Sequence, residues 1–209
     1  MAGSPQAGGS FLPSSDYDLT GQIRIVPPVA ANAPVISTLK SNISTADVSA
    51  GYATDTYLAG SSIQAPPAGF TVGMRYVCTF DMVKTAAGTA AATVIVRIGT
   101  AGAVGDTAIL TFTWGAGTAA ADTGTFTVTA HFRTVGSGTT AVLVGTCVCT
   151  HALAATGLVA TGASGNGQLQ VTSSGFDSTP AGSFIGVSFN GGASFSGTNK
   201  LVQAELRSY

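Results

Sequence analysis

Apolar and polar residues alternate most regularly between residues 124 and 151. In the first half of this stretch every second residue is apolar: Phe126, Val128, Ala130 and Phe132. The residues between them are threonines, His131 and Arg133, and a period of two is typical of a strand with one buried face. Residues 136–138 supply turn residues, and a second apolar run covers residues 141–149. The stretch therefore predicts a long antiparallel hairpin at the centre of an all-β domain.

Shorter runs of the same kind recur along the chain, separated by segments rich in glycine, proline, alanine and threonine. The candidate strands outside the hairpin are residues 56–58, 74–84, 92–99, 107–114, 167–172, 184–190 and 200–207. About eight short strands at this spacing, without a convincing helical period, are typical of a sandwich or barrel. We therefore expect residues 51–209 to form one antiparallel β domain.

The first 50 residues lack this pattern and hold too few large apolar residues for a core of their own. One short strand fits residues 22–26, but Pro27 and Pro28 end it and force an extended path. Residues 35–40 fit a second short edge strand, and residues 41–50 fit a looped or weakly helical connector. We expect residues 1–50 to form an extended arm that binds other chains through its apolar residues. Those residues are Phe11, Leu12, Tyr17, Ile23, Ile25 and Val26.

Charge is scarce throughout the chain. Only 8% of the 209 residues are charged, against about 25% in a typical soluble protein. A surface built from threonine, serine, glycine and alanine has little electrostatic repulsion, so it suits packing against other chains. The net charge of −1 argues against binding to nucleic acid, which needs a basic footprint.

Targeting signals and cysteines indicate where the protein is made. The first residues lack a basic segment followed by an apolar one, and no apolar run approaches the roughly 20 residues that span a bilayer. We therefore expect a soluble protein made in a cytoplasm, without a membrane partner. Three cysteines in that setting are expected to stay reduced.

Cys147, Cys149 and His151 form the one cluster of metal-ligating residue types. Strand alternation would place all three on one face, with Cys78 or His131 as a fourth ligand from a neighbouring strand. Complete zinc sites usually show CxxC-type spacing, however, and buried cysteines often serve as small core residues. We favour the core interpretation and expect no metal or other cofactor.

Catalytic patterns are not found. The nine carboxylates are scattered along the chain, and Asp106, Asp122 and Asp177 occur in turn contexts where aspartate caps backbone amides. A glycosidase needs two carboxyl groups about 5 to 10 Å apart in a cleft, and no pair can be nominated. The GxSxG motif of a serine hydrolase is missing, and the glycine-rich residues 162–167 lack the Lys-Ser/Thr of a phosphate loop. We expect a protein that is not an enzyme.

Two further groups could contact a partner or have only structural roles. His131 and Arg133 could bind a glycan or a neighbouring subunit, although the exposed face of a sheet often carries such residues. The aromatic residues could form a platform for sugar rings, but filling the core or a subunit interface fits them better. They are Trp114, Tyr52, Tyr57, Tyr76 and Tyr209.

Three long runs carry a family resemblance. They are residues 72–114 (VGMRYVCTFDMVKTAAGTAAATVIVRIGTAGAVGDTAILTFTW), 118–139 (TAAADTGTFTVTAHFRTVGSGT) and 184–209 (FIGVSFNGGASFSGTNKLVQAELRSY). They resemble the jelly-roll-like β-sandwich domains of structural proteins in tailed-bacteriophage virions. The resemblance covers roughly residues 56–209, and its motifs are structural rather than catalytic. It implies an all-β, jelly-roll-like antiparallel β-sandwich behind an extended N-terminal arm.

The resemblance also implies a function. It predicts a non-enzymatic virion protein, assembled in the host cytoplasm, that decorates or cements the capsid or forms a head fibre. Its partners would be the major capsid protein or other virion subunits, bound through the arm, and it would act as a homotrimer. The alternative is a tail-fibre or receptor-binding module, in which loops such as residues 161–167 and 191–197 recognise a host surface glycan.

Overall fold

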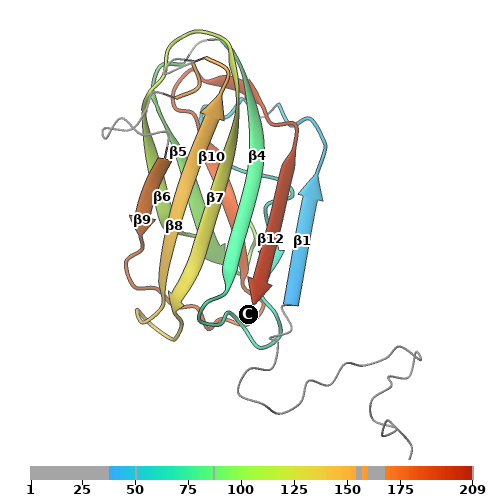
Figure 1. The fold of residues 1–209 in the computed structure, drawn as a ribbon, viewed down its shortest axis with the longest axis vertical. Coiled ribbons are helices and arrows are strands. Elements are labelled where there is room, and N and C mark those ends of the chain that lie inside the picture. Colours follow the sequence, from blue (N-terminus) through green and yellow to red (C-terminus); the bar gives the residue numbers. More distant parts are fainter. Residues whose placement is uncertain (1–37, 50, 87, 154–156, 160–167, 209) are drawn as a thin grey trace, which may run out of the picture. The chain divides into compact units, whose positions relative to one another are not determined.

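The computed structural model describes residues 38–49, 51–86, 88–153, 157–159 and 168–208. Within these residues the chain forms two antiparallel sheets that pack face to face as a sandwich (Figure 1). The described part contains no helix that is long and apolar enough to cross a membrane. The all-β antiparallel sandwich predicted from the sequence is therefore confirmed.

The larger sheet contains the central hairpin. Along its main path the strand order is β1-β12-β4-β7-β8-β9, and β11 pairs with β4. The bounds are β1 Thr38–Ser44, β4 Arg75–Ala86, β7 Asp122–Thr134, β8 Val142–His151, β9 Gln168–Thr172, β11 Ser196–Thr198 and β12 Val202–Ser208. Strands β7 and β8 pair in antiparallel register, with Phe126 opposite Cys149 and Val128 opposite Cys147. The predicted hairpin thus lies inside this sheet, with neighbours on both sides.

The smaller sheet covers the inner face of the larger one. Its order is β2-β10-β5-β6, with β3 also paired to β10. The bounds are β2 Thr56–Tyr57, β3 Ile63–Gln64, β5 Ala91–Gly99, β6 Thr107–Ala116 and β10 Phe184–Asn190. In β10 the inward residues Ile185, Val187 and Phe189 are fully buried, because they face the larger sheet.

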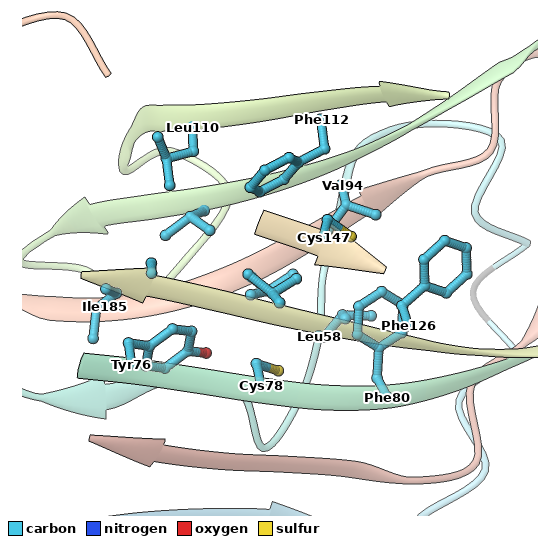
Figure 2. Packing of buried hydrophobic residues seen from close by; sticks show 14 of the residues in the cluster. Leu58, Tyr76, Cys78, Phe80, Val94, Leu110, Phe112, Phe126, Cys147 and Ile185 are labelled. Carbon is cyan, nitrogen blue, oxygen red and sulfur yellow. The ribbon is translucent and has the colours of Figure 1, made fainter. Parts of the chain in front are cut away.

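An aromatic cluster joins the two sheets. The rings of Phe80 and Phe126 stack with centroids 5.0 Å apart, and Figure 2 shows them side by side on the larger sheet. From the smaller sheet, Phe189 approaches Phe126 at 5.5 Å and Trp114 approaches it edge-on at 6.0 Å. Leu110 and Phe112 project from β6 into the same core (Figure 2). Phe126 therefore lies where the two sheets meet.

The first described strand differs from the prediction. Strand β1 covers Thr38–Ser44 and pairs along its whole length with β12, whereas the sequence predicted a strand at residues 35–40 and a connector at residues 41–50. An edge strand is held by backbone pairing, so it need not show apolar alternation. Leu39 and Ile43 are 52% and 56% exposed. The compact unit accordingly begins at Ser37 rather than at residue 51.

Two side chains connect the edge strand β1 to the backbone of residues 62–65. Lys40 Nζ donates hydrogen bonds to the carbonyl oxygens of Gln64 and Ala65 at 3.0 and 3.1 Å. Asn42 Nδ2 donates to the carbonyl oxygen of Ser62 at 2.8 Å. Polar side chains on an edge strand also discourage unwanted pairing with other chains. Because of these contacts, β1 is an integral part of the sandwich.

The aromatic cluster yields a stability prediction. Phe126→Ala should lower the free energy of unfolding by about 3–5 kcal/mol, because it leaves a cavity between the two sheets. The neighbouring Thr125 is exposed, so Thr125→Ala should change it by no more than about 0.5 kcal/mol. Urea unfolding followed by circular dichroism measures both values. Equal effects of the two substitutions would contradict the assigned core.

Candidate functional site

The cysteine and histidine cluster does not assemble as a metal site. Cys147 and Cys149 point into the core, and Figure 2 shows Cys147 among apolar side chains. His131 is exposed on the opposite face of the sheet, while His151 Nδ1 lies 2.9 Å from Asp122 Oδ2. Among the described residues no group of three or more histidine, cysteine, aspartate or glutamate side chains could hold a metal ion. The interpretation of the cysteines as core residues is confirmed.

All three thiols are buried and unreactive in character. Burial raises the pKa of Cys78 to about 12 and that of Cys149 to about 12. Burial also raises the pKa of Cys147 well above its ordinary value. A thiol with such a pKa carries almost no thiolate at neutral pH, so it is a poor nucleophile and a poor metal ligand.

A buried lysine and a buried aspartate lie at one end of the sandwich. Lys84 on β4 and Asp122 on β7 are register partners that both point inward, and they are 1% and 6% exposed. Lys84 Nζ donates to the carbonyl oxygens of Gly88 at 2.7 Å, Gly157 at 2.9 Å and Thr118 at 2.5 Å. All three ammonium protons are therefore used, and the lysine cannot act as a nucleophile.

Asp122, like Lys84, is held by several hydrogen bonds to the backbone. Its carboxylate accepts hydrogen bonds from the amides of Thr123, Leu153 and Leu158 at 2.8, 3.1 and 2.9 Å, besides the contact with His151. Burial by itself raises the pKa of Asp122, but the hydrogen bonds outweigh it, so the pKa lies below its ordinary value. Burial lowers the pKa of Lys84, and the charge of Asp122 opposes that shift. The pair ties loop backbone to the ends of β4 and β7.

The phase of the alternation in the sequence is a signal for this buried pair. Lys84 continues the inward positions of β4, after Tyr76, Cys78, Phe80 and Met82. Asp122 similarly continues the inward positions of β7. A charged residue in phase with a buried alternation must find polar partners inside the protein.

Other carboxylates among the described residues bind backbone amides or pair with a basic side chain. The Asp106 carboxylate accepts hydrogen bonds from the amides of Ala101 and Ala103. The Asp177 carboxylate accepts hydrogen bonds from the amide and the hydroxyl of Thr179. These contacts confirm the turn interpretation of both residues. On the outer face of the smaller sheet, Asp55 forms an ion pair with Arg97, which is 9% exposed.

Each nitrogen of the Arg97 guanidinium donates a hydrogen bond to a neighbour. Besides Asp55, it donates to Ser188 Oγ at 2.9 Å and to the carbonyl oxygen of Asp106 at 2.6 Å. Arg97 and its partners therefore hold the loop before β6 in place, and they do not form a pair of carboxylates in a cleft.

The aromatic residues serve mainly the core. Tyr52, Tyr76 and Trp114 are 1%, 0% and 2% exposed, and the Tyr76 hydroxyl donates to the carbonyl oxygen of Ser61 at 2.6 Å. Tyr57 is partly buried beside Gly186, and Tyr209 lies outside the described residues. The described aromatic residues thus form no exposed platform.

Two grooves flank the loop that precedes β10. One has a volume of about 540 Å³ and is lined by Lys40, Pro66, Pro67, Phe70, Val135 and Pro180, among others. The other has a volume of about 620 Å³ and includes Asp106, Phe176, Asp177 and Pro180. The two carboxylates and Lys40 are already held by the backbone contacts described above. Each groove therefore offers a surface of mixed polar and apolar character.

The proposed partner-binding positions divide between described and undescribed parts of the chain. The arm residues Phe11, Leu12, Tyr17, Ile23, Ile25 and Val26 lie outside the described residues, as do the short strand at residues 22–26 and the loop at residues 161–167. The loop at residues 191–197 is described, and Phe195 anchors it in the core at 5.5 Å from Phe189. His131 and Arg133 are exposed on the outer face of β7, where the alternation placed them.

Comparison with known proteins adds no relative. No protein-family model matches the chain, and a search of curated proteins gives no match.

The environment of Asp122 predicts a pH dependence. Its pKa is lower in the folded chain than in the unfolded one, so it stabilises the fold above the unfolded pKa, near 4. That contribution is lost as the pH falls through the folded-state pKa. Asp122→Asn should therefore cost about 1–3 kcal/mol of unfolding free energy at neutral pH, and the difference from wild type should shrink in acid.

Urea unfolding at pH about 7 and about 3 tests this linkage. Asp47→Asn is the control, because Asp47 is largely exposed and contacts Lys200 only at 3.6 Å. The control should match wild type at both pH values. A deficit of Asp122→Asn that stays constant or grows in acid would contradict the assigned role.

The buried thiols predict slow chemical modification. A disulfide reagent such as DTNB should label none of the three cysteines of the native protein at neutral pH, and all three after denaturation. Thr125→Cys places a thiol at an exposed position of the same sheet and should be labelled at once. Rapid labelling of the wild-type protein would show that its cysteines are accessible.

Proposed function

We propose that the chain is a non-enzymatic structural protein of a tailed-bacteriophage virion that decorates or cements the capsid. The observation that carries this proposal is the outer face of the larger sheet. Its central positions hold threonine, valine and glutamine, such as Thr127, Thr129, Thr146 and Gln170. The part of this face that β7 before His131, β8 and β9 form has no charged residue at its outward positions, so it can pack against other subunits without the desolvation cost of buried charges.

The polar interior supports a structural rather than a chemical role. Lys84, Asp122, Arg97 and Asp106 all direct polar atoms at backbone groups, and Asp122 and Arg97 also bind neighbouring side chains. An active site needs groups that remain available to a substrate. In this sandwich the buried charges instead fix loops at both ends.

The binding mechanism would be adhesive. Residues 1–37 precede β1, and their apolar residues would add strands to coat subunits or fill grooves between them. The sandwich would pack against its own copies as a trimer. Repetition over the shell would convert modest contacts into net stabilisation of the particle.

The grooves beside Pro180 favour a second candidate function, a tail-fibre or receptor-binding module. Two hollows of about 540 and 620 Å³ at one end of the sandwich could take a host surface glycan. This candidate predicts binding to host cells through the sandwich alone, and loss of that binding when groove residues are changed.

Copy number in purified particles tests the proposal first. Quantitative mass spectrometry against the major coat protein should give a ratio close to that of the coat protein. A handful of copies per particle would favour the tail-fibre candidate, and complete absence from particles would overturn both.

Removal of the arm tests the mechanism. The shortened chain should begin at Ser37, because deletion of all 50 residues would also remove β1 from the sheet. We expect this variant to fold but to lose most binding to particles that lack the protein. A control variant that exchanges the six apolar arm residues for serine should show the same loss. Undiminished binding of both variants would contradict attachment through the arm.

A further inference from the structure

A row of basic side chains, two arginines and a histidine, crosses three neighbouring strands on the outer face of the larger sheet. Arg75 of β4 lies directly opposite Arg207 of β12 on one side and opposite His131 of β7 on the other. Neighbouring strands are about 4.8 Å apart, so the three residues occupy roughly 10 Å of the surface. The exposed Arg133 follows two residues after His131, at a bulge in β7.

This concentration is unusual for a chain with so few charges. Only 8 lysine and arginine residues occur in 209, and three arginines gather in this patch. Glu205 is the carboxylate beside the row, and it is engaged by Arg207 at 2.7 Å. Within the described residues, Arg75 and Arg133 form no ion pair. The patch therefore keeps an excess of positive charge.

The arrangement opposes the stability of the isolated sandwich. Like charges directly opposite each other on paired strands are destabilising. Partial burial, together with the positive charge of Arg75, lowers the pKa of His131. In addition, Arg75 Nε is buried without a hydrogen-bond partner among the described residues. Features that break the local rules of stability tend to mark functional positions.

The surroundings of the row define the kind of partner that fits it. Leu39 lies opposite Arg207 and is 52% exposed, and the half-buried Val144 lies opposite His131. Neither of the two grooves beside Pro180 includes Arg75, Arg207 or His131. A small anion on so flat a surface would stay in water and bind weakly, whereas a protein surface would cover the row and exclude water.

We propose that Arg75, Arg207, His131 and Arg133 form a docking surface for a carboxylate-rich patch on a neighbouring virion protein. The identity of that neighbour rests on the proposed function. Guanidinium groups bind carboxylates through two parallel hydrogen bonds, which gives orientation as well as attraction. Leu39 and Val144 supply apolar contact at the two ends of the row. An acidic partner would also remove the repulsion that the row imposes on the free protein.

The test uses purified full-length protein and particles that lack it. Arg75→Gln/Arg133→Gln removes the two arginines without an ion pair, and Arg75→Lys/Arg133→Lys keeps the charge at the same positions. Lys200→Gln, which removes a 50% exposed cation elsewhere, controls for net charge. Binding is measured by co-sedimentation at about 50 mM and about 300 mM salt, where screening differs strongly.

The glutamine double variant should bind particles at least about tenfold more weakly than wild type at low salt, and the gap should narrow at high salt. The lysine double variant should recover a large part of the binding, and Lys200→Gln should match wild type. The glutamine variant should also be at least as stable to heat as wild type, because it relieves the opposition of like charges. A purely structural role for the arginines predicts the reverse.

The outcomes separate this inference from the proposed function. If wild type does not bind the particles, the proposed function fails and the assigned partner fails with it. If wild type binds and the glutamine variant binds equally well, the docking surface is overturned while the proposed function stands. If the row instead governs binding to duplex DNA or to vesicles of anionic lipid, and particle binding is unchanged, a protein partner is also overturned.

Discussion

The contact between the inner face of β7 and the smaller sheet is the interaction on which the structure depends. Phe126 touches Phe80 within its own sheet and meets Phe189 and Trp114 from the other. Burial of each aromatic side chain contributes about 1.5–3 kcal/mol, so a few such rings supply a large part of the stability of a sandwich. Because the core provides this stability, the outer faces are free to carry small polar residues that add little to it.

A sandwich held together in this way must still close its ends, where strands stop and loops begin. At one end Lys84 binds three carbonyl oxygens and Asp122 binds three amides, so buried charges take the place of hydrophobic packing. On the smaller sheet Arg97 connects Asp55, Ser188 and the backbone of Asp106. Unpaired charges in such positions would be very costly, so the hydrogen bonds of Lys84, Asp122 and Arg97 explain why these groups remain inside.

The sequence predicts those features that depend on local alternation. The residues of the central hairpin, the inward cysteines and the turn role of Asp106 and Asp177 follow from patterns within a few neighbouring positions. Strand β1 was misplaced because its stability comes from backbone pairing with β12, more than 150 residues away, and leaves no apolar period. Lys84 and Asp122 are in phase with the buried positions of their strands. A hydropathy pattern does not show, however, which carbonyl oxygens accept hydrogen bonds from the lysine or which amides donate to the aspartate.

The alternation in the sequence places His131 and Arg133 on the outer face of β7, but it does not reveal the rest of the basic row. Arg75 and Arg207 come from β4 and β12 and meet His131 only through the register of the sheet. If one of these strands shifted its register by one residue, its outward side chains would turn toward the core. The basic side chains would then no longer lie next to one another. The same backbone pairing that stabilises the sheet therefore also holds Arg75 between Arg207 and His131.

The fixed register of the sheet also bears on the proposed attachment to a particle. An arm binds wherever its apolar residues find a groove, and it carries little information about orientation. A row of guanidinium groups fixed on a rigid sheet binds only where carboxylates match its spacing. Two attachments of these different kinds would hold the sandwich tightly through the arm and in one orientation through the row. Because the remaining outer face is nearly uncharged, the row would be the main electrostatic feature that distinguishes one docking direction from another.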